Sequence, residues 1–229
     1  ERIPILVTTQ RTETEAQVKG STLREVFNDV LSRDQIENLA RVSGVVERVR
    51  KRDMVSLVWA LVLVAGSDDS GRLADAYTAY LGESDESVVR GSFYAWFDGR
   101  MADFMRELTQ NALDVVRGQA PMIRGGLAGV TDWIAVDSET VTLRDELAST
   151  FPATSTPAGL KIHKFFSVGR GNIVDFKVSP AREHDARHLR IDESWAGLGL
   201  LVDLGYASHQ LIRDCQRYDV ELVLRLKNG

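Results

Sequence analysis

The chain has little of what several protein classes require. Its 229 residues include one cysteine, Cys215, so an intramolecular disulfide is excluded and a reducing, cytosolic compartment is expected. The longest apolar run, residues 54–65, is shorter than the ~20 residues that cross a bilayer, so no membrane partner is expected. Lysine and arginine total 28 against 33 aspartates and glutamates, so the chain lacks the basic excess typical of nucleic-acid binders.

Basic residues are nevertheless concentrated in a few segments. Residues 48–52 are RVRKR, and residues 181–190 (AREHDARHLR) carry three arginines at nearly helical spacing. Lysines on the preceding hairpin extend this second cluster. Such side chains suit contacts to phosphates, although solvation of a charged helix end explains them as well. The candidates for DNA contact are Arg48, Arg50, Lys51, Arg52, Lys161, Lys164, Arg182, Arg187, Arg225 and Lys227.

The hydrophobic pattern separates a helical part of the chain from a part with strands. Residues 1–21 are largely polar and unpatterned, and we expect them to form an arm or linker. Residues 22–124 show apolar spacings of three and four residues, which predict an all-helical domain. Within it, Ser32 and Gln35 resemble a capping box, and Gly44 suits a helix C-terminus.

From residue 125 onward the pattern changes to short apolar strands and turns. The second and third predicted strands are joined at GRGN, which is a hairpin signal. Two helices are predicted, over residues 181–195 and 207–218. The order β-β-β-α-β-α-β predicts a mixed sheet with helices packed on it. The predicted strands lie within residues 131–143, 160–170, 172–180, 197–205 and 219–227.

Two aspartates occupy the predicted strands. Asp137 lies in the first strand of the sheet, and Asp203 ends the fourth. If these strands are neighbours, both carboxylates meet at one end of the sheet, where α/β folds place their sites. Carboxylates bind hard cations such as Mg²⁺ or Mn²⁺, and two such metals ~3.5–4 Å apart clamp the attacking and leaving oxygens of a phosphodiester. Alternatively, each aspartate caps a turn or opens a helix.

The motifs around these residues resemble those of a known family. IAVDSET (residues 134–140), EHD (183–185) and LLVDLGYAS (200–208) are similar to motifs of DDE transposases from bacterial insertion sequences, in the large group with a β-rich insertion. The predicted strand order is that of the ribonuclease H-like fold, and residues 22–124 resemble the helical N-terminal part of the same group. The resemblance implies an α+β or α/β chain: an all-α domain, then an incomplete ribonuclease H-like mixed sheet with flanking helices.

The resemblance also implies a metal-dependent polynucleotidyl transferase. Asp137 and Asp203 match the first two members of the family's catalytic triad. The third, a glutamate on a later helix, has no counterpart before Gly229, so the catalytic core of residues 125–229 is expected to be truncated before it. Mg²⁺ or Mn²⁺ is the expected cofactor, in a two-metal site when complete. The expected partners are the double-stranded DNA of the element ends and of the target, bound by a homo-oligomer. The expected location is the prokaryotic cytoplasm, in association with the nucleoid. The helical domain is expected to serve DNA binding or dimerisation.

Three more side chains are auxiliary candidates. Glu139 shares the strand face of Asp137, and His184 and Asp185 match a His-Asp pair of the family. A solvated strand neighbour and the polarity of a helix start explain them as well. The expected reaction is DNA cleavage at the ends of a mobile element, followed by attack of the freed 3′-hydroxyl. The alternatives are an inactive transposase fragment that acts as a DNA-binding regulatory protein, and another ribonuclease H-like nuclease.

Overall fold

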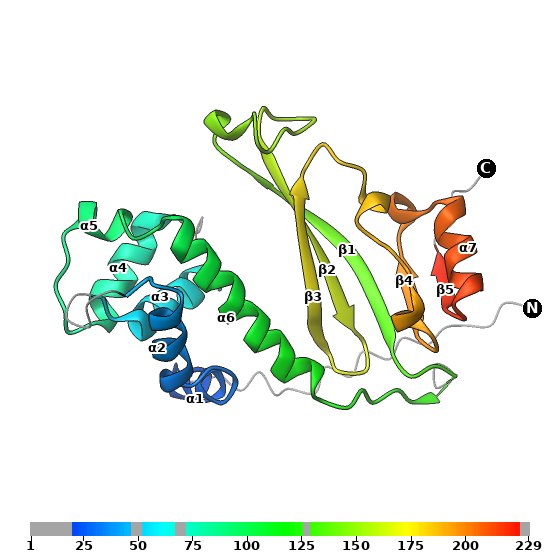
Figure 1. Ribbon diagram of the computed structural model, residues 1–229, viewed down its shortest axis with the longest axis horizontal. Coiled ribbons are helices and arrows are strands. Elements are labelled where there is room, and N and C mark those ends of the chain that lie inside the picture. Colours follow the sequence, from blue (N-terminus) through cyan, green and yellow to red (C-terminus); the bar gives the residue numbers. More distant parts are fainter. Residues whose placement is uncertain (1–19, 47–51, 67–71, 126–128, 225–229) are drawn as a thin grey trace, which may run out of the picture. The chain divides into compact units, whose positions relative to one another are not determined.

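The computed structural model describes residues 20–46, 52–66, 72–125 and 129–224, so most of the predicted arm lies outside it. The chain divides into two compact units, residues 1–109 and residues 110–229. The division falls within the long helix α6, Gly99–Arg117, which therefore contributes to both units (Figure 1).

The first unit is built from helices whose ends are marked in the sequence. Ser32 precedes α2 (Arg33–Val42), and its hydroxyl accepts a hydrogen bond from the Gln35 amide while the Gln35 side chain accepts one from the Ser32 amide. This confirms the predicted capping box. Gly44, at φ 70°, follows the C-cap residue of α2. The other helices of this unit are α1 (Gly20–Val30), α3 (Met54–Ala65), α4 (Leu73–Glu83) and α5 (Arg90–Tyr94).

Helix α3 contains the longest apolar run, and only its first half lies in the core. Leu57 and Val58 are fully buried, whereas Val62 and Leu63 are 43% and 38% exposed. The second half of this apolar run is therefore partly exposed rather than part of the core. Across the residues that the structure describes, no helix is long and apolar enough to span a bilayer.

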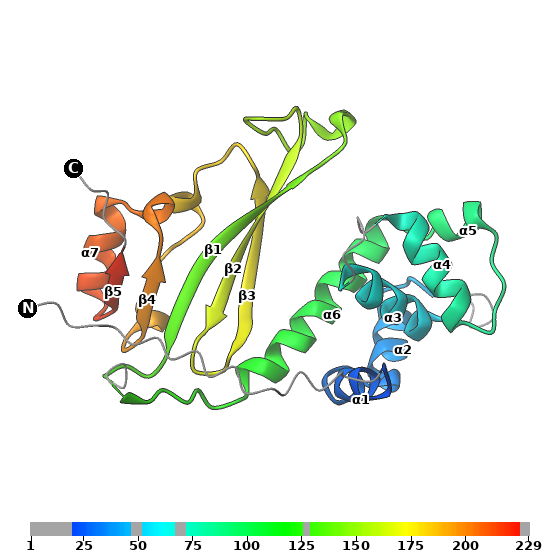
Figure 2. The same ribbon diagram turned by 180° about the vertical axis from the view of Figure 1, so that it is seen from behind.

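The second unit is a five-stranded mixed sheet in the order β3-β2-β1-β4-β5. β1 lies at its centre, antiparallel to β2 on one side and parallel to β4 on the other, while β3 and β5 form the edges (Figure 1, Figure 2). This arrangement is that of an α+β ribonuclease H-like fold. The elements are β1 (Trp133–Thr142), β2 (Gly159–Ser167), β3 (Asn172–Pro180), β4 (Gly199–Val202), α7 (His209–Arg217) and β5 (Glu221–Leu224).

One face of this sheet carries the core. Because side chains alternate along a strand, Ile134 and Val136 of β1 share this face with their partners on β4, Leu200 and Val202. Leu211 of α7 and other residues of the following segments pack against it. The residues next to Val136 and Val202 therefore project from the opposite face.

The helix predicted over residues 181–195 is wrong. The segment forms two short 3₁₀ turns, η3 (Asp185–Arg187) and η4 (Glu193–Trp195). Leu189 and Ile191 between them are both buried in the core. Residues two apart lie on different sides of an α-helix, so burying both requires an irregular path. The three arginines of this segment do not share a helical face.

Candidate active site

The two aspartates lie side by side at one end of the sheet. β1 and β4 are parallel, and Val136 is the register partner of Val202. Asp137 and Asp203 each follow this pair directly. The prediction that the first and fourth strands are neighbours is confirmed, because their pairing is direct. Both carboxylates lie toward the carboxyl ends of parallel strands, the edge where α/β sheets place ligands.

Each of these carboxylates is exposed and keeps one oxygen available. Asp137 Oδ1 accepts a hydrogen bond from the Ser138 amide at 2.8 Å, and Asp203 Oδ1 accepts one from the Gly205 amide at 3.0 Å. Asp203 thereby caps the 3₁₀ turn η5 (Leu204–Tyr206) through its Oδ1. This agrees with the alternative interpretation that the aspartate caps a turn. Neither Oδ2 has a hydrogen-bond partner among the described residues. The two side chains line one open hollow together with Leu201 and Val223.

This pair suits a hard divalent cation as part of a ligand set. Mg²⁺ and Mn²⁺ take oxygen ligands and keep several waters, which needs exposed carboxylates of this kind. Across the described residues, however, no group of three or more His, Cys, Asp or Glu side chains lies close enough to hold a metal ion. Within the described part of the chain, the pair at this edge is therefore Asp137 and Asp203 without a third ligand.

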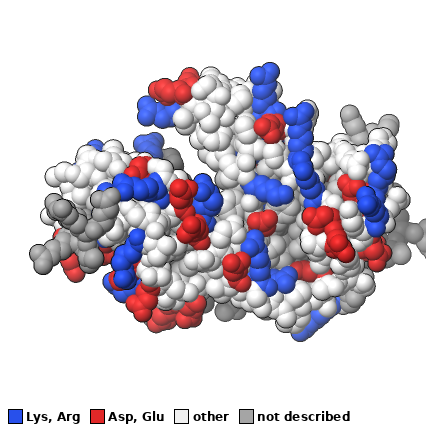
Figure 3. Space-filling model, viewed as in Figure 1, with Lys and Arg blue, Asp and Glu red and all other residues white. Residues whose placement is uncertain are grey.

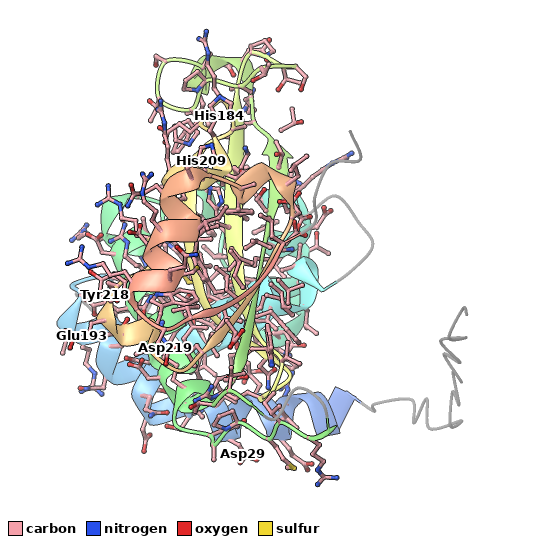
Figure 4. The ribbon with its side chains drawn as sticks, turned by 90° about the vertical axis from the view of Figure 1, so that its right-hand side faces the viewer. Asp29, His184, Glu193, His209, Tyr218 and Asp219 are labelled. Carbon is pink, nitrogen blue, oxygen red and sulfur yellow. The ribbon has the colours of Figure 1, made fainter. Side chains whose placement is uncertain are left out.

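Two of the three acidic residues after Asp203, Asp219 and Glu221, lie away from the site. Glu221 is the register partner of Gly199, at the opposite end of β4 from Asp203. The Asp219 carbonyl accepts a hydrogen bond from the Gly197 amide at 3.1 Å, before β4 begins. Figure 4 shows Asp219 at the end of α7 opposite His209, the residue that begins the helix next to the site. Neither supplies a third carboxylate beside Asp137.

Asp185 lies beside the aspartate pair. Its Oδ1 is 2.8 Å from Lys161 Nζ on β2 and accepts a hydrogen bond from the Ser138 hydroxyl at 3.2 Å. The side chain is 21% exposed, so the ion pair is largely shielded from solvent. His184, predicted with it, is exposed at the start of η3. The structure thus brings one member of the predicted His-Asp pair to the site.

Glu139 points along the outer face of β1 and makes a different contact. Lys164, the cross-strand partner of Asp137, donates a hydrogen bond to Glu139 Oε2 at 2.8 Å. This hydrogen bond lowers the pKa of Glu139. Both side chains are solvated, and the contact occupies one Glu139 oxygen.

A buried histidine lies behind the site. His163 is fully buried, and burial lowers its pKa, with the charge of nearby His188 acting in the same direction. Its Nε2 is 3.0 Å from the Ser179 hydroxyl, and its Nδ1 is 2.9 Å from the Tyr206 hydroxyl. The tautomer with the proton on Nε2 lets the ring donate to Ser179 and accept from Tyr206 at Nδ1, and it leaves the Ser179 proton for the Pro180 carbonyl, 3.4 Å away.

Tyr206 connects that histidine to the acidic cluster. Burial raises the pKa of Tyr206 to about 12, and the negative charges of Asp185, Asp137 and Asp203 add to this, although a hydrogen bond with Ser138 opposes it. The phenol therefore stays protonated and remains a donor at neutral pH. Tyrosine in the motif DLGY gave no sequence signal of this role, because only the fold brings residue 206 to residue 163.

The predicted basic residues differ in whether their side chains already form an ion pair or hydrogen bond within the protein. Lys161 is paired with Asp185 and Lys164 with Glu139. Arg52 donates to the Val45 carbonyl and lies over the Trp96 ring in the first unit. Arg182, Arg187 and Arg190 are exposed, and within the described residues their guanidinium groups have no hydrogen bond or ion pair. Arg48, Arg50, Lys51, Arg225 and Lys227 lie outside the described residues.

Comparison with known proteins gives one match. Residues 129–229 match the family model of the transposase DDE domain. No curated protein and no solved structure matches the chain significantly. The matched segment contains both aspartates and all five strands of the sheet.

Proposed function

We propose, because residues 129–229 belong to the transposase DDE domain family, that the protein is a transposase that cleaves and joins DNA at the ends of a mobile element. One observation carries the proposal: the parallel register of β1 and β4 sets Asp137 and Asp203 next to each other, where both line one open hollow. The matched family consists of polynucleotidyl transferases. A pair of carboxylates at a sheet edge suits the same metal-dependent phosphoryl transfer.

Asp137 and Asp203 would hold Mg²⁺ or Mn²⁺. When bound, such a metal lowers the pKa of water and neutralises charge on a phosphodiester. The chain's own contribution is to hold one carboxylate within β1, at Asp137, and the other directly after β4, at Asp203. The openness of the hollow suits a long, charged polymer better than a small enclosed substrate.

Free arginines on the segment that carries Asp185 suit a DNA backbone. Arg182, Arg187 and Arg190 lie on the segment that also carries Asp185, and their charges are unpaired among the described residues. In the view of Figure 3, the Lys and Arg side chains of the second unit are interspersed with Asp and Glu side chains. Contact is therefore proposed at individual arginines rather than at a continuous basic surface. We propose double-stranded DNA as the partner, bound by a homo-oligomer.

The aspartate pair can be tested directly in the full-length protein. Asp137→Asn and Asp203→Asn should each lower Mg²⁺-dependent cleavage of a plasmid carrying the element ends by more than about 100-fold, since even the outer partners of metal ligands are worth roughly 10–100-fold. Glu139→Gln is the matched control, because it removes a carboxylate two residues away whose Oε2 is already bonded to Lys164. Undiminished cleavage in either aspartate variant would refute the assignment.

A second candidate function is DNA binding without cleavage, as in a regulatory transposase fragment. It is favoured by one finding: within the described residues, no group of three or more acidic, histidine or cysteine side chains is arranged to hold a metal ion. This candidate predicts that the protein binds element ends and leaves them uncut at every metal concentration. A third possibility, another ribonuclease H-like nuclease, predicts cleavage without strand-transfer products in the same plasmid assay.

A further inference from the structure

We propose that Lys161 and Asp185 are positioning residues that set the spacing of the two aspartate-bearing segments. The inference rests on the proposed function of Asp137 and Asp203 and concerns what holds these side chains in place. Neither Lys161 nor Asp185 is assigned a direct contact with DNA or metal. The two residues lie on β2 and on η3, outside the strands that carry the aspartate pair.

Asp203 needs such support because the sheet does not orient it. β4 ends at Val202, so Asp203 lies just beyond the last residue paired with β1. Its carboxylate is oriented by the η5 turn, through the hydrogen bond that its Oδ1 accepts from the Gly205 amide. Any shift of η5 relative to β1 therefore changes the distance between the two aspartates.

Asp185 contacts both segments at once. Its Oδ1 accepts a hydrogen bond from Ser138, the residue next to Asp137. Its Oδ2 faces Gly205: a Cβ placed there would lie 3.0 Å from Asp185 Oδ2 and 3.2 Å from Asp203 Oδ1. Gly205 does not have a positive φ, so this position favours glycine because there is no space for a side chain between the two carboxylates.

Lys161 makes this close approach of like charges stable. Two carboxylates near each other repel, and a cation between the elements offsets that repulsion. The Lys161 side chain is 13% exposed, and its Nζ is held by both Asp185 at 2.8 Å and the Glu183 carbonyl at 3.0 Å. It is therefore a fixed cation rather than a mobile surface charge. The hydrogen bond between Tyr206 and His163 anchors η5 to β2 from beneath.

The direction in which Mn²⁺ affinity changes when Lys161 is replaced distinguishes a positioning role from a direct role. If Asp185 were a metal ligand, or acted only through its field, removing the Lys161 cation would leave more negative charge at the site and tighten Mn²⁺ binding. If Lys161 positions Asp185, its removal loosens η5 and weakens binding. Loss of a supporting partner of a metal ligand typically costs roughly 10–100-fold in affinity.

The test measures Mn²⁺ binding to the purified full-length protein by electron paramagnetic resonance, with thermal unfolding recorded for each variant. Lys161→Met should weaken binding about 10-fold or more, and Lys161→Arg should restore most of it. Ser138→Ala provides a second, charge-neutral variant that removes one contact of Asp185 and should weaken binding several-fold. The matched control is Lys164→Met, which removes a cation opposite Asp137 that is paired with Glu139, and it should not weaken binding.

Two outcomes would overturn the inference. One is unchanged or tighter Mn²⁺ binding in Lys161→Met, and the other is unchanged binding in Ser138→Ala. Asp137→Asn and Asp203→Asn, measured in the same assay, test the proposed function separately: if both bind Mn²⁺ like the unaltered protein, the metal site itself is refuted. If they lose binding while Lys161→Met and Ser138→Ala do not, only the positioning role fails.

Discussion

At the scale of single residues, the chain separates a structural aspartate from the two at the site. Asp132 is 1% exposed and accepts hydrogen bonds from four donors: the Trp133 and Gly169 amides, the Ser167 hydroxyl and the Arg170 guanidinium. Together these four contacts hold the buried carboxylate in place. Asp137 and Asp203, by contrast, are exposed and each keep a free oxygen. In the sequence, Asp132 and Asp137 stand in the same apolar stretch and cannot be told apart by pattern.

Removing the arginine partner of Asp132 should destabilise the second unit. Arg170→Met leaves the buried carboxylate without its cation, which typically costs about 3 kcal/mol or more of unfolding free energy. The matched control is Arg144→Met, because the pair of Arg144 with Glu146 is 87% and 74% exposed and contributes little. Urea unfolding followed by circular dichroism measures both. Equal stability of the two variants would contradict a structural role for the Asp132 pair.

At the scale of elements, the contact between β1 and β4 decides whether a site exists. Trp133 and Gly199 are the first register pair of these strands. A Cβ on Gly199 would lie 2.4 Å from the Trp133 ring, so the indole occupies the space that any side chain at residue 199 would need. The glycine therefore allows the strands to pair in the register that places Asp137 next to Asp203.

Gly199→Ala should accordingly disturb both the fold and the site. Overpacking of this kind typically costs about 1–3 kcal/mol, because the indole or the strand has to move. We expect a lower unfolding free energy together with weaker metal-dependent cleavage. Gly129→Ala is the control, since a Cβ there meets no atom within 4 Å. Thermal unfolding and the plasmid assay measure the two effects, and a Gly199 variant as stable and active as the control would argue against this role.

The secondary-structure elements also show where the sequence pattern gives a wrong prediction. The strands, the hairpin and the last helix were predictable because their apolar residues alternate or recur at helical spacing. Residues 181–195 carry charged residues at nearly helical intervals, yet they form two 3₁₀ turns. Burial of both Leu189 and Ile191 outweighs the local preference, since helix propensity is a weak term compared with the burial of large apolar side chains.

At the scale of the whole molecule, net charge does not favour DNA binding. The formal charge is −5, so long-range attraction to DNA is absent and contact depends on local cations. Among the described residues, Arg182 and Arg187 lie on the segment that also carries Asp185, and their charges are unpaired. These two therefore account for a measurable share of the phosphate contacts in our proposal.

The salt dependence of DNA binding tests this. Each phosphate contact to duplex DNA contributes a slope of about −0.9 in a plot of log affinity against log salt concentration. The double variant Arg182→Ala, Arg187→Ala should therefore reduce the slope by about 2 and weaken binding. The control is Arg213→Ala, Arg217→Ala on α7, where Arg213 donates to Gln210 and Arg217 lies over the Tyr218 ring. An equal change in both double variants would show that the effect is one of total charge.

Local sequence patterns were enough to predict the order of the strands and to single out the two aspartates as candidate oxygen ligands, because these inferences depend on periodicity and on the chemistry of a carboxylate. Tertiary structure alone decided the pairing of β1 with β4, the burial of His163 and Tyr206, and the convergence of Lys161, Asp185 and Ser138 on one point. Those contacts join residues up to 66 positions apart, such as Val136 and Val202, and no spacing along a chain records which distant residues will pack together. Which distant residues meet depends on how the hydrophobic core packs.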